Sequence, residues 1–263
     1  MKNFFEYLGV LAIIAFSFFY TEKVALVVQS KNPVMQEIVE AEKRHNIEFV
    51  NATIEGDYII PGNNGLKINA TKSFRNMRSF GVFNEYYLVF NQITPDISVE
   101  NNKDKIINSG NPSRKNIAII FEATSDLSSF ALQKGYKVNL LVNQSSYISN
   151  DFYEMINNEF DKTKFSDVEV LLNKNRVNKY ICLVSDKNMD LCKKNGNYLI
   201  SPTYVLSATN VVEVKNKINN GGILLIENSA SLADFQLIVN QITYRGLVVV
   251  PISELISEVL DDK

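Results

Sequence analysis

Two glutamates, Glu122 and Glu227, stand where acid–base chemistry is often placed in α/β proteins. Each directly follows a short apolar run, residues 116–121 and 223–226, of the kind expected for a strand buried in a parallel sheet. In such folds the catalytic and binding residues lie at the carboxyl ends of the strands. Glycoside hydrolases use a pair of carboxylates for catalysis. The alternative is that each glutamate is a solvated residue at a strand end, and the sequence leaves both interpretations open.

Three further polar side chains are placed by the same argument. Asn228 follows Glu227, Asp126 comes shortly after Glu122, and Asn143 follows the next apolar run along the chain. Asn143, Asn228 and Asp126 are therefore predicted ligand-binding residues. Asp126 has the alternative role of a helix cap, because Asp is favoured at that position.

The histidine and the cysteines limit the available chemistry. The only histidine, His45, lies in the polar run 42–46, where an exposed surface residue is expected rather than a metal ligand. Cys182 and Cys192 are ten positions apart, which excludes a Cys-x-x-Cys redox or zinc motif. They are expected either to form a local disulfide outside the cell or to be two buried thiols. Without a histidine nearby, neither is expected to be a nucleophile.

The composition excludes several function classes. The chain has 263 residues, 46% of them apolar, which is enough for a sizeable core in one or two domains. The net charge is −2 and the sequence pI about 5.6, so that no basic surface favours non-specific nucleic-acid binding. We therefore predict no nucleic-acid partner. The sequence also contains no Gly-x-Gly-x-x-Gly, P-loop or Gly-x-Ser-x-Gly motif.

The N-terminus carries an apolar run of about seventeen residues, 4–20, with one charge, Glu6, near its edge. This length is at the short limit for a membrane-spanning helix, and aromatic residues at both ends suit the two membrane interfaces. No small-x-small cleavage site follows. We expect an uncleaved signal anchor over residues 1–22, with a cleaved signal peptide as second choice and a core helix as third. The prediction is a single-pass cell-membrane protein with most of the chain extracytoplasmic.

Residues 23–112 are predicted to form a separate accessory α+β region. Its helices are indicated by apolar residues at helical spacing, and its strands by short β-branched or alternating runs. The predicted order is a strand at 24–28, a helix at 33–44, a strand within 47–60, a helix at 69–80, a strand at 83–90, and a polar linker at 96–114.

Residues 113–263 are predicted to form an α/β domain with a parallel sheet. The order strand, helix, glycine, strand recurs along this region, and Gly221–Leu255 is its clearest βαβ unit. A stretch between 145 and 179 is predicted to be mostly helical. The predicted strands cover 116–121, 136–142, 180–184, 198–200, 223–226 and 247–250, and the other helices 126–134, 186–194, 211–218, 232–244 and 251–260.

The stretch Gly221–Leu255 also resembles the C-terminal end of the polysaccharide deacetylase homology domain. That family ends in a Gly-rich turn, a strand of the type Ile-Leu-Leu-His-Asp, a helix, a hydrophobic strand and a Ser-Glu-Leu helix, and only the His-Asp pair is missing here. The region before residue 113 is similar to the accessory region of some membrane-anchored bacterial relatives. The resemblance implies an incomplete or distorted (β/α) barrel, because about 150 residues are fewer than the 200 or more of a full barrel.

The same resemblance shows where the chain departs from active members. They use a divalent metal such as zinc, held by an Asp and two His, with a second Asp as base and a C-terminal His as general acid. Here Glu122 and Ala123 stand at the base and metal-ligand positions, Asn143 begins the segment where the histidine pair is expected, and Glu227 replaces the general acid. The His-His-Asp site cannot be built from these residues, so that no metal and no cofactor are predicted.

The sequence therefore predicts a membrane-anchored, extracytoplasmic deacetylase-like protein without the usual metal ligands. The first hypothesis is a non-catalytic homologue that binds a cell-wall glycan or an envelope protein. The alternative is an active carbohydrate hydrolase. It would be either an N-deacetylase with a rebuilt site, acting on a C–N amide bond, or a glycosidase that uses Glu122 and Glu227.

Overall fold

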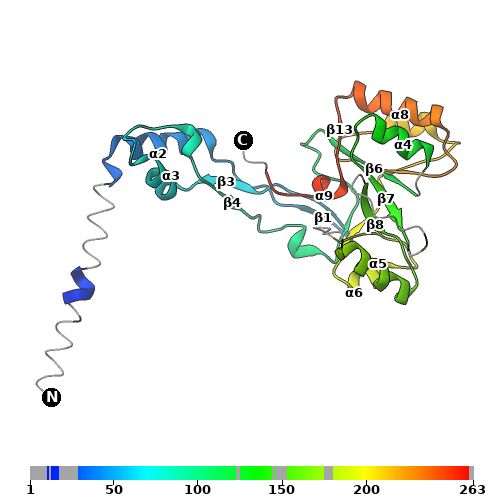
Figure 1. The fold of residues 1–263 in the computed structure, drawn as a ribbon, viewed down its shortest axis with the longest axis horizontal. Helices are drawn as coiled ribbons and strands as arrows, with labels where there is room; N and C mark the ends of the chain where they lie inside the picture. The colour runs from blue at the N-terminus through cyan, green and yellow to red at the C-terminus, as the bar shows by residue number, and fades with distance from the viewer. Residues whose placement is uncertain are drawn as a thin grey trace, which may run out of the picture. The chain divides into compact units, whose positions relative to one another are not determined.

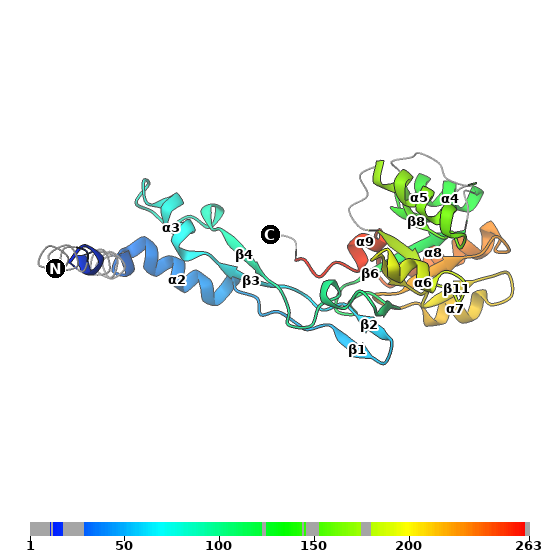
Figure 2. The same cartoon turned by 90° about the horizontal axis from the view of Figure 1, so that it is seen from below.

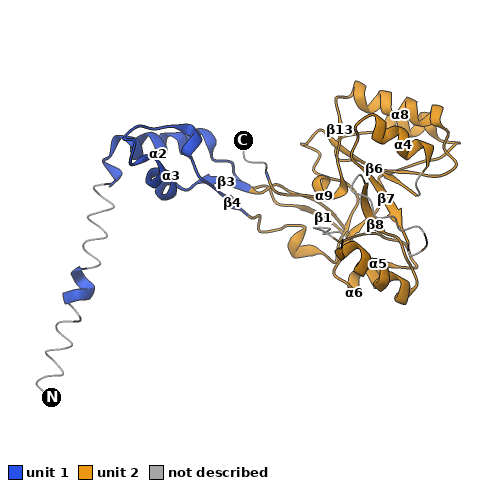
Figure 3. Cartoon of the chain, in the orientation of Figure 1, with its two compact units in different colours: residues 1–48, 65–93, 260–263 blue, residues 49–64, 94–259 orange. Residues whose placement is uncertain are grey.

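The chain folds into two compact units. The computed structural model (Figure 1) describes residues 11, 13–17, 29–122, 125–143, 145, 153–174 and 180–260. Unit 1 comprises residues 1–48, 65–93 and 260–263, and unit 2 comprises residues 49–64 and 94–259 (Figure 3). This division differs from the boundary predicted at residue 112, because residues 49–64 and 94–112 supply strands to the sheet of unit 2.

Unit 1 joins two helices and an antiparallel strand pair around a small apolar core. The side chain of Asn32 accepts a hydrogen bond from the backbone N–H of Val34, and Pro33 follows it, so that the first helix begins where the Asn-Pro pair predicts. The helices predicted at 33–44 and 69–80 are confirmed, although the second ends earlier. The elements are α2 (Pro33–His45), β3 (Gly65–Ile68), α3 (Ala70–Met77), η1 (Glu85–Tyr87) and β4 (Phe90–Ile93).

The strand predicted at 83–90 is wrong. The side chain of Asn84 accepts a hydrogen bond from the N–H of Tyr86, at 3.0 Å, and this local contact starts the 3₁₀ turn η1 instead of a strand. Only Phe90 of the predicted stretch lies in β4. A side chain that bonds to its own backbone has here overridden the β-propensity of the aromatic residues around it.

Two predictions concern residues near the N-terminus. The signal anchor expected over residues 1–22 lies largely outside the described residues, and so does the strand expected at 24–28. Among the residues that the structure describes, no helix has the length and apolar character needed to cross a membrane.

Unit 2 is built on a curled, mostly parallel sheet that forms half a barrel (Figure 2). The strand order is β1-β2-β5-β10-β9-β8-β7-β6-β12-β11, with β13 also paired to β6, and only β1 and β2 are antiparallel. The strands are β1 (Thr53–Glu55), β2 (Tyr58–Ile60), β5 (Ile106–Ile107), β6 (Asn116–Phe121), β7 (Val138–Val142), β8 (Tyr153–Asn157), β9 (Ile181–Leu183), β10 (Tyr198–Ile200), β11 (Tyr204–Leu206), β12 (Ile223–Ile226) and β13 (Val248–Val249).

Both faces of the central strands are buried, which explains their continuous apolar sequence. On β6, Ile119 and Phe121 belong to one apolar cluster, whereas Ala118 and Ile120 belong to another. The first cluster includes side chains of four helices, and Figure 1 shows two of them, α4 and α8, side by side. The helices of unit 2 are α4 (Asp126–Gln133), α5 (Lys162–Lys174), α6 (Met189–Lys194), α7 (Val211–Lys217), α8 (Leu232–Tyr244) and α9 (Ile252–Leu255), with the 3₁₀ turn η2 (Glu100–Asn102).

Several elements of unit 2 differ from the prediction. Residues 153–157 form strand β8 rather than a helix, with Met155 in one apolar cluster and Ile156 in the other. Apolar residues therefore occur here at spacings that fit both a helix and a strand buried on two faces, and pairing with β7 decides for the strand. The predicted linker at 96–114 contains β5, and the last predicted helix ends at Leu255.

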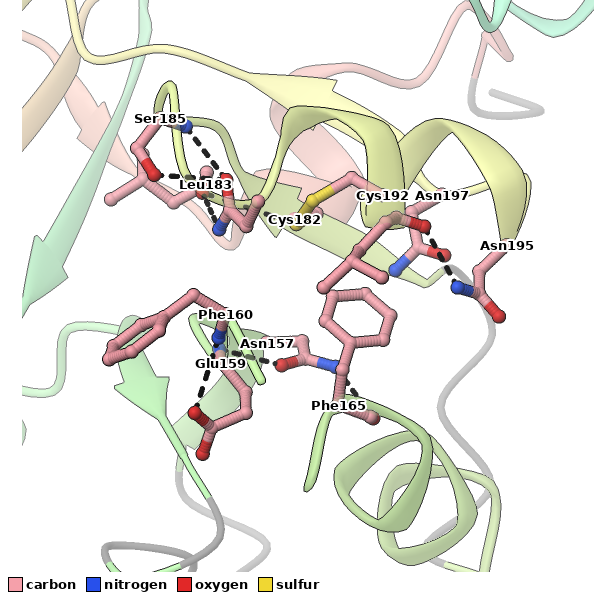
Figure 4. The surroundings of a disulfide bond; sticks show 12 residues. Asn157, Glu159, Phe160, Phe165, Cys182, Leu183, Ser185, Cys192, Asn195 and Asn197 are labelled. Carbon is pink, nitrogen blue, oxygen red and sulfur yellow. Dashed lines mark hydrogen bonds between the residues drawn. A yellow bond between two sulfur atoms is a disulfide. The ribbon is translucent and has the colours of Figure 1, made fainter. Parts of the chain in front are cut away.

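Cys182 on β9 and Cys192 on α6 are joined by a disulfide (Figure 4). Both cysteines are fully buried, and they pack with Phe165 and Leu199 in a cluster of their own. The bond closes a loop of ten residues between a sheet strand and the short helix that follows it. A six-residue helix has little stability of its own, so that this crosslink fixes α6 on the sheet.

Replacing both cysteines by alanine should lower the free energy of unfolding of unit 2 by about 2–4 kcal/mol, because the crosslink restricts the unfolded chain. Urea unfolding of the wild type, with and without a reductant, measures the effect of the crosslink without the loss of packing. The matched control is Cys192→Ala alone in reductant, which reports only the lost packing. An unchanged urea midpoint after verified reduction of the wild type would contradict this prediction.

Candidate functional site

The carboxyl ends of β6 and β12 frame a hollow of about 260 Å³ in unit 2. The two strands are parallel neighbours, and their last residues, Phe121 and Ile226, are partners in the register. Glu122 and Glu227 directly follow that pair, so that the sheet itself sets them at one edge. The hollow is lined by Phe121, Glu122, Ser125, Asp126, Leu127, Ile226, Glu227, Asn228, Ala230 and Leu232.

The two glutamates are held by different contacts. An oxygen of the Glu122 carboxylate, Oε2, accepts a hydrogen bond from the backbone N–H of Asn228, at 3.2 Å. Oε2 of Glu227 accepts one from the hydroxyl of Ser229, at 3.3 Å. Glu122 is exposed and Glu227 half-buried. Both glutamate carboxylates therefore retain free acceptor capacity for a ligand.

Asp126 lies in the hollow, but it is not the helix cap. α4 begins at Asp126, and the cap is Ser125, whose hydroxyl accepts from the N–H of Ser128 while the Ser128 hydroxyl accepts from the N–H of Ser125. The capping role that the sequence allowed for Asp126 thus belongs to its neighbour. Asp126 occupies the first turn of α4, where a negative charge interacts favourably with the helix dipole.

Asn143 is not brought together with the glutamates. It follows β7 and lines a second hollow of about 460 Å³ with Ser145, Glu159, Phe160 and Lys164. Its side-chain oxygen accepts hydrogen bonds from the N–H and the hydroxyl of Ser145, at 3.1 and 2.7 Å. Four of the five predicted site residues therefore share one hollow, and Asn143 lies in another.

Glu159 is a buried carboxylate that the sequence reasoning missed. Only 6% of the residue is exposed, and its Oε1 accepts from the backbone N–H of Phe160, at 3.2 Å. It follows shortly after β8, the strand that was expected to be helical. A strand prediction at 153–157 would have placed Glu159 at the same strand-end edge as the other candidates.

The described residues contain no group of three or more His, Cys, Asp or Glu side chains that could hold a metal. Ala123, at the predicted metal-ligand position, lies outside the described residues. His45 belongs to unit 1, where its Nε2 lies 3.4 Å from a carboxylate oxygen of Glu85. Within the described part of unit 2, the polar side chains that line the hollow are carboxylates, an amide and a hydroxyl. This mixture of acceptors and donors suits hydrogen bonding to hydroxyl-rich molecules.

The fold is similar to that of solved structures described as CE4 family proteins, a family that includes polysaccharide deacetylases. Wild-type BA3943, described as a CE4 family pseudoenzyme from Bacillus anthracis, superimposes with a TM-score of 0.57 and 17% identity, over 87% of this chain and 96% of that chain. A BA3943 mutant described as having restored enzymatic activity gives 0.56 and 16%, over 87% and 99%. The resemblance to the deacetylases that the sequence indicated is thus confirmed in the fold.

The match to a curated protein sequence covers a smaller part of the chain than the structural matches do. The uncharacterized protein YlxY of Bacillus subtilis strain 168 is 33% identical over 95 residues, which is 36% of this chain. The chain matches only 30% of the length of that relative. No family model matches the chain.

Proposed function

We propose that the chain is a non-catalytic member of the CE4 family that binds a cell-wall glycan or an envelope protein. The observation that carries this proposal is the histidine count: the only histidine, His45, belongs to unit 1, and Glu227 stands where the resemblance expects the general acid. A chain with one histidine cannot supply the two histidine ligands that the family uses. The description of BA3943 as a pseudoenzyme of the same fold supports the proposal.

The hollow at Glu122 and Glu227 is the proposed binding site. The carboxylates of Glu122, Asp126 and Glu227 and the amide of Asn228 supply acceptors and donors for sugar hydroxyl or N-acetyl groups. Apolar side chains, among them Phe121 and Leu127, line the same hollow and suit the apolar face of a sugar ring. Recognition of a hydroxyl-rich ligand requires this mixture, and it needs no metal.

We also propose that residues 4–20 anchor the chain in the cell membrane, with most of it outside. The disulfide between Cys182 and Cys192 supports an oxidising compartment, because such bonds are rare in the reducing cytosol. An extracytoplasmic position would bring unit 2 to cell-wall glycans.

A hydrolase remains the second candidate because Glu122 and Glu227 share one hollow. As a glycosidase, one carboxylic acid would protonate the leaving oxygen, while the other carboxylate would activate water or attack the sugar carbon. As an N-deacetylase, Glu122 would take the proton of the attacking water and Glu227 would protonate the leaving amine. Both schemes need the two carboxylates in different protonation states.

Calorimetry and an acetate assay on the full chain, in detergent or nanodiscs, test the proposal. N-acetylated chitooligosaccharides and peptidoglycan fragments are the ligands, with zinc, cobalt or manganese added in separate runs. We expect saturable glycan binding that weakens about tenfold or more in Glu122→Gln and Glu227→Gln, since each loses charge-assisted hydrogen bonds. Glu213→Gln, on the exposed side of α7, is the matched control.

Either of two results would overturn the binding-protein proposal. Stoichiometric metal binding with acetate release that Glu122→Gln abolishes would establish a deacetylase. Shortened glycan products that require both Glu122 and Glu227 would establish a glycosidase. Glycan binding that is equal in all three variants would move the binding site away from this hollow.

A further inference from the structure

Unit 1 exposes a group of aromatic, apolar and basic side chains on and after α3, called here the α3 face. Phe80 is 60% exposed, Val82 63% and Tyr86 95%. Exposure of single large apolar residues is normal, but here three of them fall within seven positions of the sequence. The α3 face comprises Lys72, Arg75, Arg78, Phe80, Val82 and Tyr86.

The packing of α3 determines which side chains face solvent. Ser73 and Met77 are fully buried, and Met77 belongs to the core of unit 1. Lys72, Arg75 and Arg78 are exposed, and none of them has an ion-pair partner among the described residues. The sequence from 70 to 84 contains no acidic residue. The face therefore carries three uncompensated positive charges.

The aromatic part of the face is ordered by local contacts. The rings of Phe80 and Tyr87 stack, with centroids 5.4 Å apart and 17° between their planes. Glu85 is the nearest acidic residue in the sequence, and its carboxylate lies 3.6 Å from Arg44 and 3.4 Å from His45. Those contacts draw the negative charge of Glu85 toward α2, while Tyr86 beside it points into solvent.

We propose that the α3 face docks on the surface of an anionic lipid bilayer. Aromatic rings with one polar end suit the headgroup region, and the positive charges of Lys and Arg are attracted to anionic lipid. A neutral glycan offers no negative charge to three uncompensated cations. A self-association surface would need acidic groups on the same face to pair with them. The combination of exposed apolar side chains and unpaired cations therefore favours a lipid surface.

The chain length permits this contact alongside the proposed anchor. The apolar run ends at Tyr20 and α2 begins at Pro33, and the twelve residues between them span at most about 45 Å in any conformation. The α3 face would act as a second membrane contact, made by folded unit 1. It is independent of what the hollow of unit 2 binds.

A single introduced fluorophore tests the proposal, because the chain contains no tryptophan. The full chain carrying Tyr86→Trp is added to phosphatidylcholine vesicles with or without phosphatidylglycerol, and quenching by brominated acyl chains is measured. Tyr244→Trp, on unit 2 and 86% exposed, is the matched control. We expect a blue shift and quenching for Tyr86→Trp with anionic vesicles only. Adding Arg75→Glu and Arg78→Glu should weaken that association about thirtyfold or more, because two attractive charges are lost and two repulsive ones are gained.

Several outcomes would overturn the proposal. One is quenching of Tyr86→Trp that is no greater than for Tyr244→Trp. Another is quenching that is unchanged in neutral vesicles or after the charge reversals, since proximity to the anchor alone would then explain it. A blue shift that depends on protein concentration without lipid would assign the face to a second copy, and one produced by peptidoglycan fragments would assign it to glycan. Circular dichroism of each variant verifies the fold.

Discussion

Replacing Glu258 by alanine should lower the free energy of unfolding of unit 2 by about 2–6 kcal/mol. The residue is only 9% exposed, yet it carries a carboxylate whose two oxygens are both engaged. Oε1 accepts from the backbone N–H of Gly62 and Oε2 from that of Val99, each at 3.0 Å in buried surroundings. Truncation would leave two buried N–H groups without an acceptor, and each costs about 1–3 kcal/mol.

Urea unfolding of Glu258→Ala, followed by circular dichroism, measures this loss. Glu258→Gln retains one carbonyl oxygen and should fall between the wild type and Glu258→Ala. Glu254→Gln, an exposed carboxylate on the same short segment, should change the stability by no more than about 0.5 kcal/mol. If Glu258→Ala were as stable as Glu254→Gln, the carboxylate would not hold these loops together.

Gly221→Ala should be similarly damaging, by about 3 kcal/mol or more, whereas Gly246→Ala should cost about 1 kcal/mol. Both glycines have positive φ, +77° and +65°, and an added side chain is destabilising in that conformation at either position. They differ in their surroundings. A Cβ on Gly221 would lie 2.5 Å from the backbone oxygen of Gly110, while one on Gly246 would meet nothing within 4 Å.

The contact at Gly221 involves main chain, so that no side-chain rotation can relieve it. Gly110 donates its N–H to the carbonyl of Gly221 at 2.7 Å, and the N–H of Gly221 donates to the carbonyl of Asn116, also at 2.7 Å. Both variants carry the cost of positive φ, and only Gly221→Ala carries the steric clash as well. The difference between their unfolding midpoints therefore measures the cost of the clash. Equal midpoints would show that the loop moves aside without cost.

The sequence predicts best those strands that are buried on both faces. β6 was predicted residue for residue, because a strand covered on two sides reads as an unbroken apolar run. β5 has only two residues, Ile106–Ile107, and no local pattern marks so short a strand. The role of Asn139 was also hidden: its amide donates to the carbonyl of Ile119 and accepts from the N–H of Ile252, a bridge made by residues far apart in the chain.

The candidate site was partly predictable for the same reason. Glu122 and Glu227 could be placed together because residues that follow neighbouring parallel strands share an edge, and the register of β6 with β12 brings them there. Asn143 follows β7 but bonds back to Ser145 in a different hollow. Strand order decides which strand ends are neighbours. The conformation of the loop after a strand decides which hollow its side chains enter, and a single sequence carries little information about loop conformation.

The two units are interleaved along the chain, which passes between them after residues 48, 64, 93 and 259. A protein starting at residue 113 would lack β1, β2 and β5, and β10 would become a bare edge that invites pairing with other chains. The unit with the two-glutamate hollow therefore corresponds to no contiguous stretch of coding sequence. The shortest contiguous stretch that holds all of it runs from residue 49 to residue 259, and this stretch also includes residues 65–93 of unit 1.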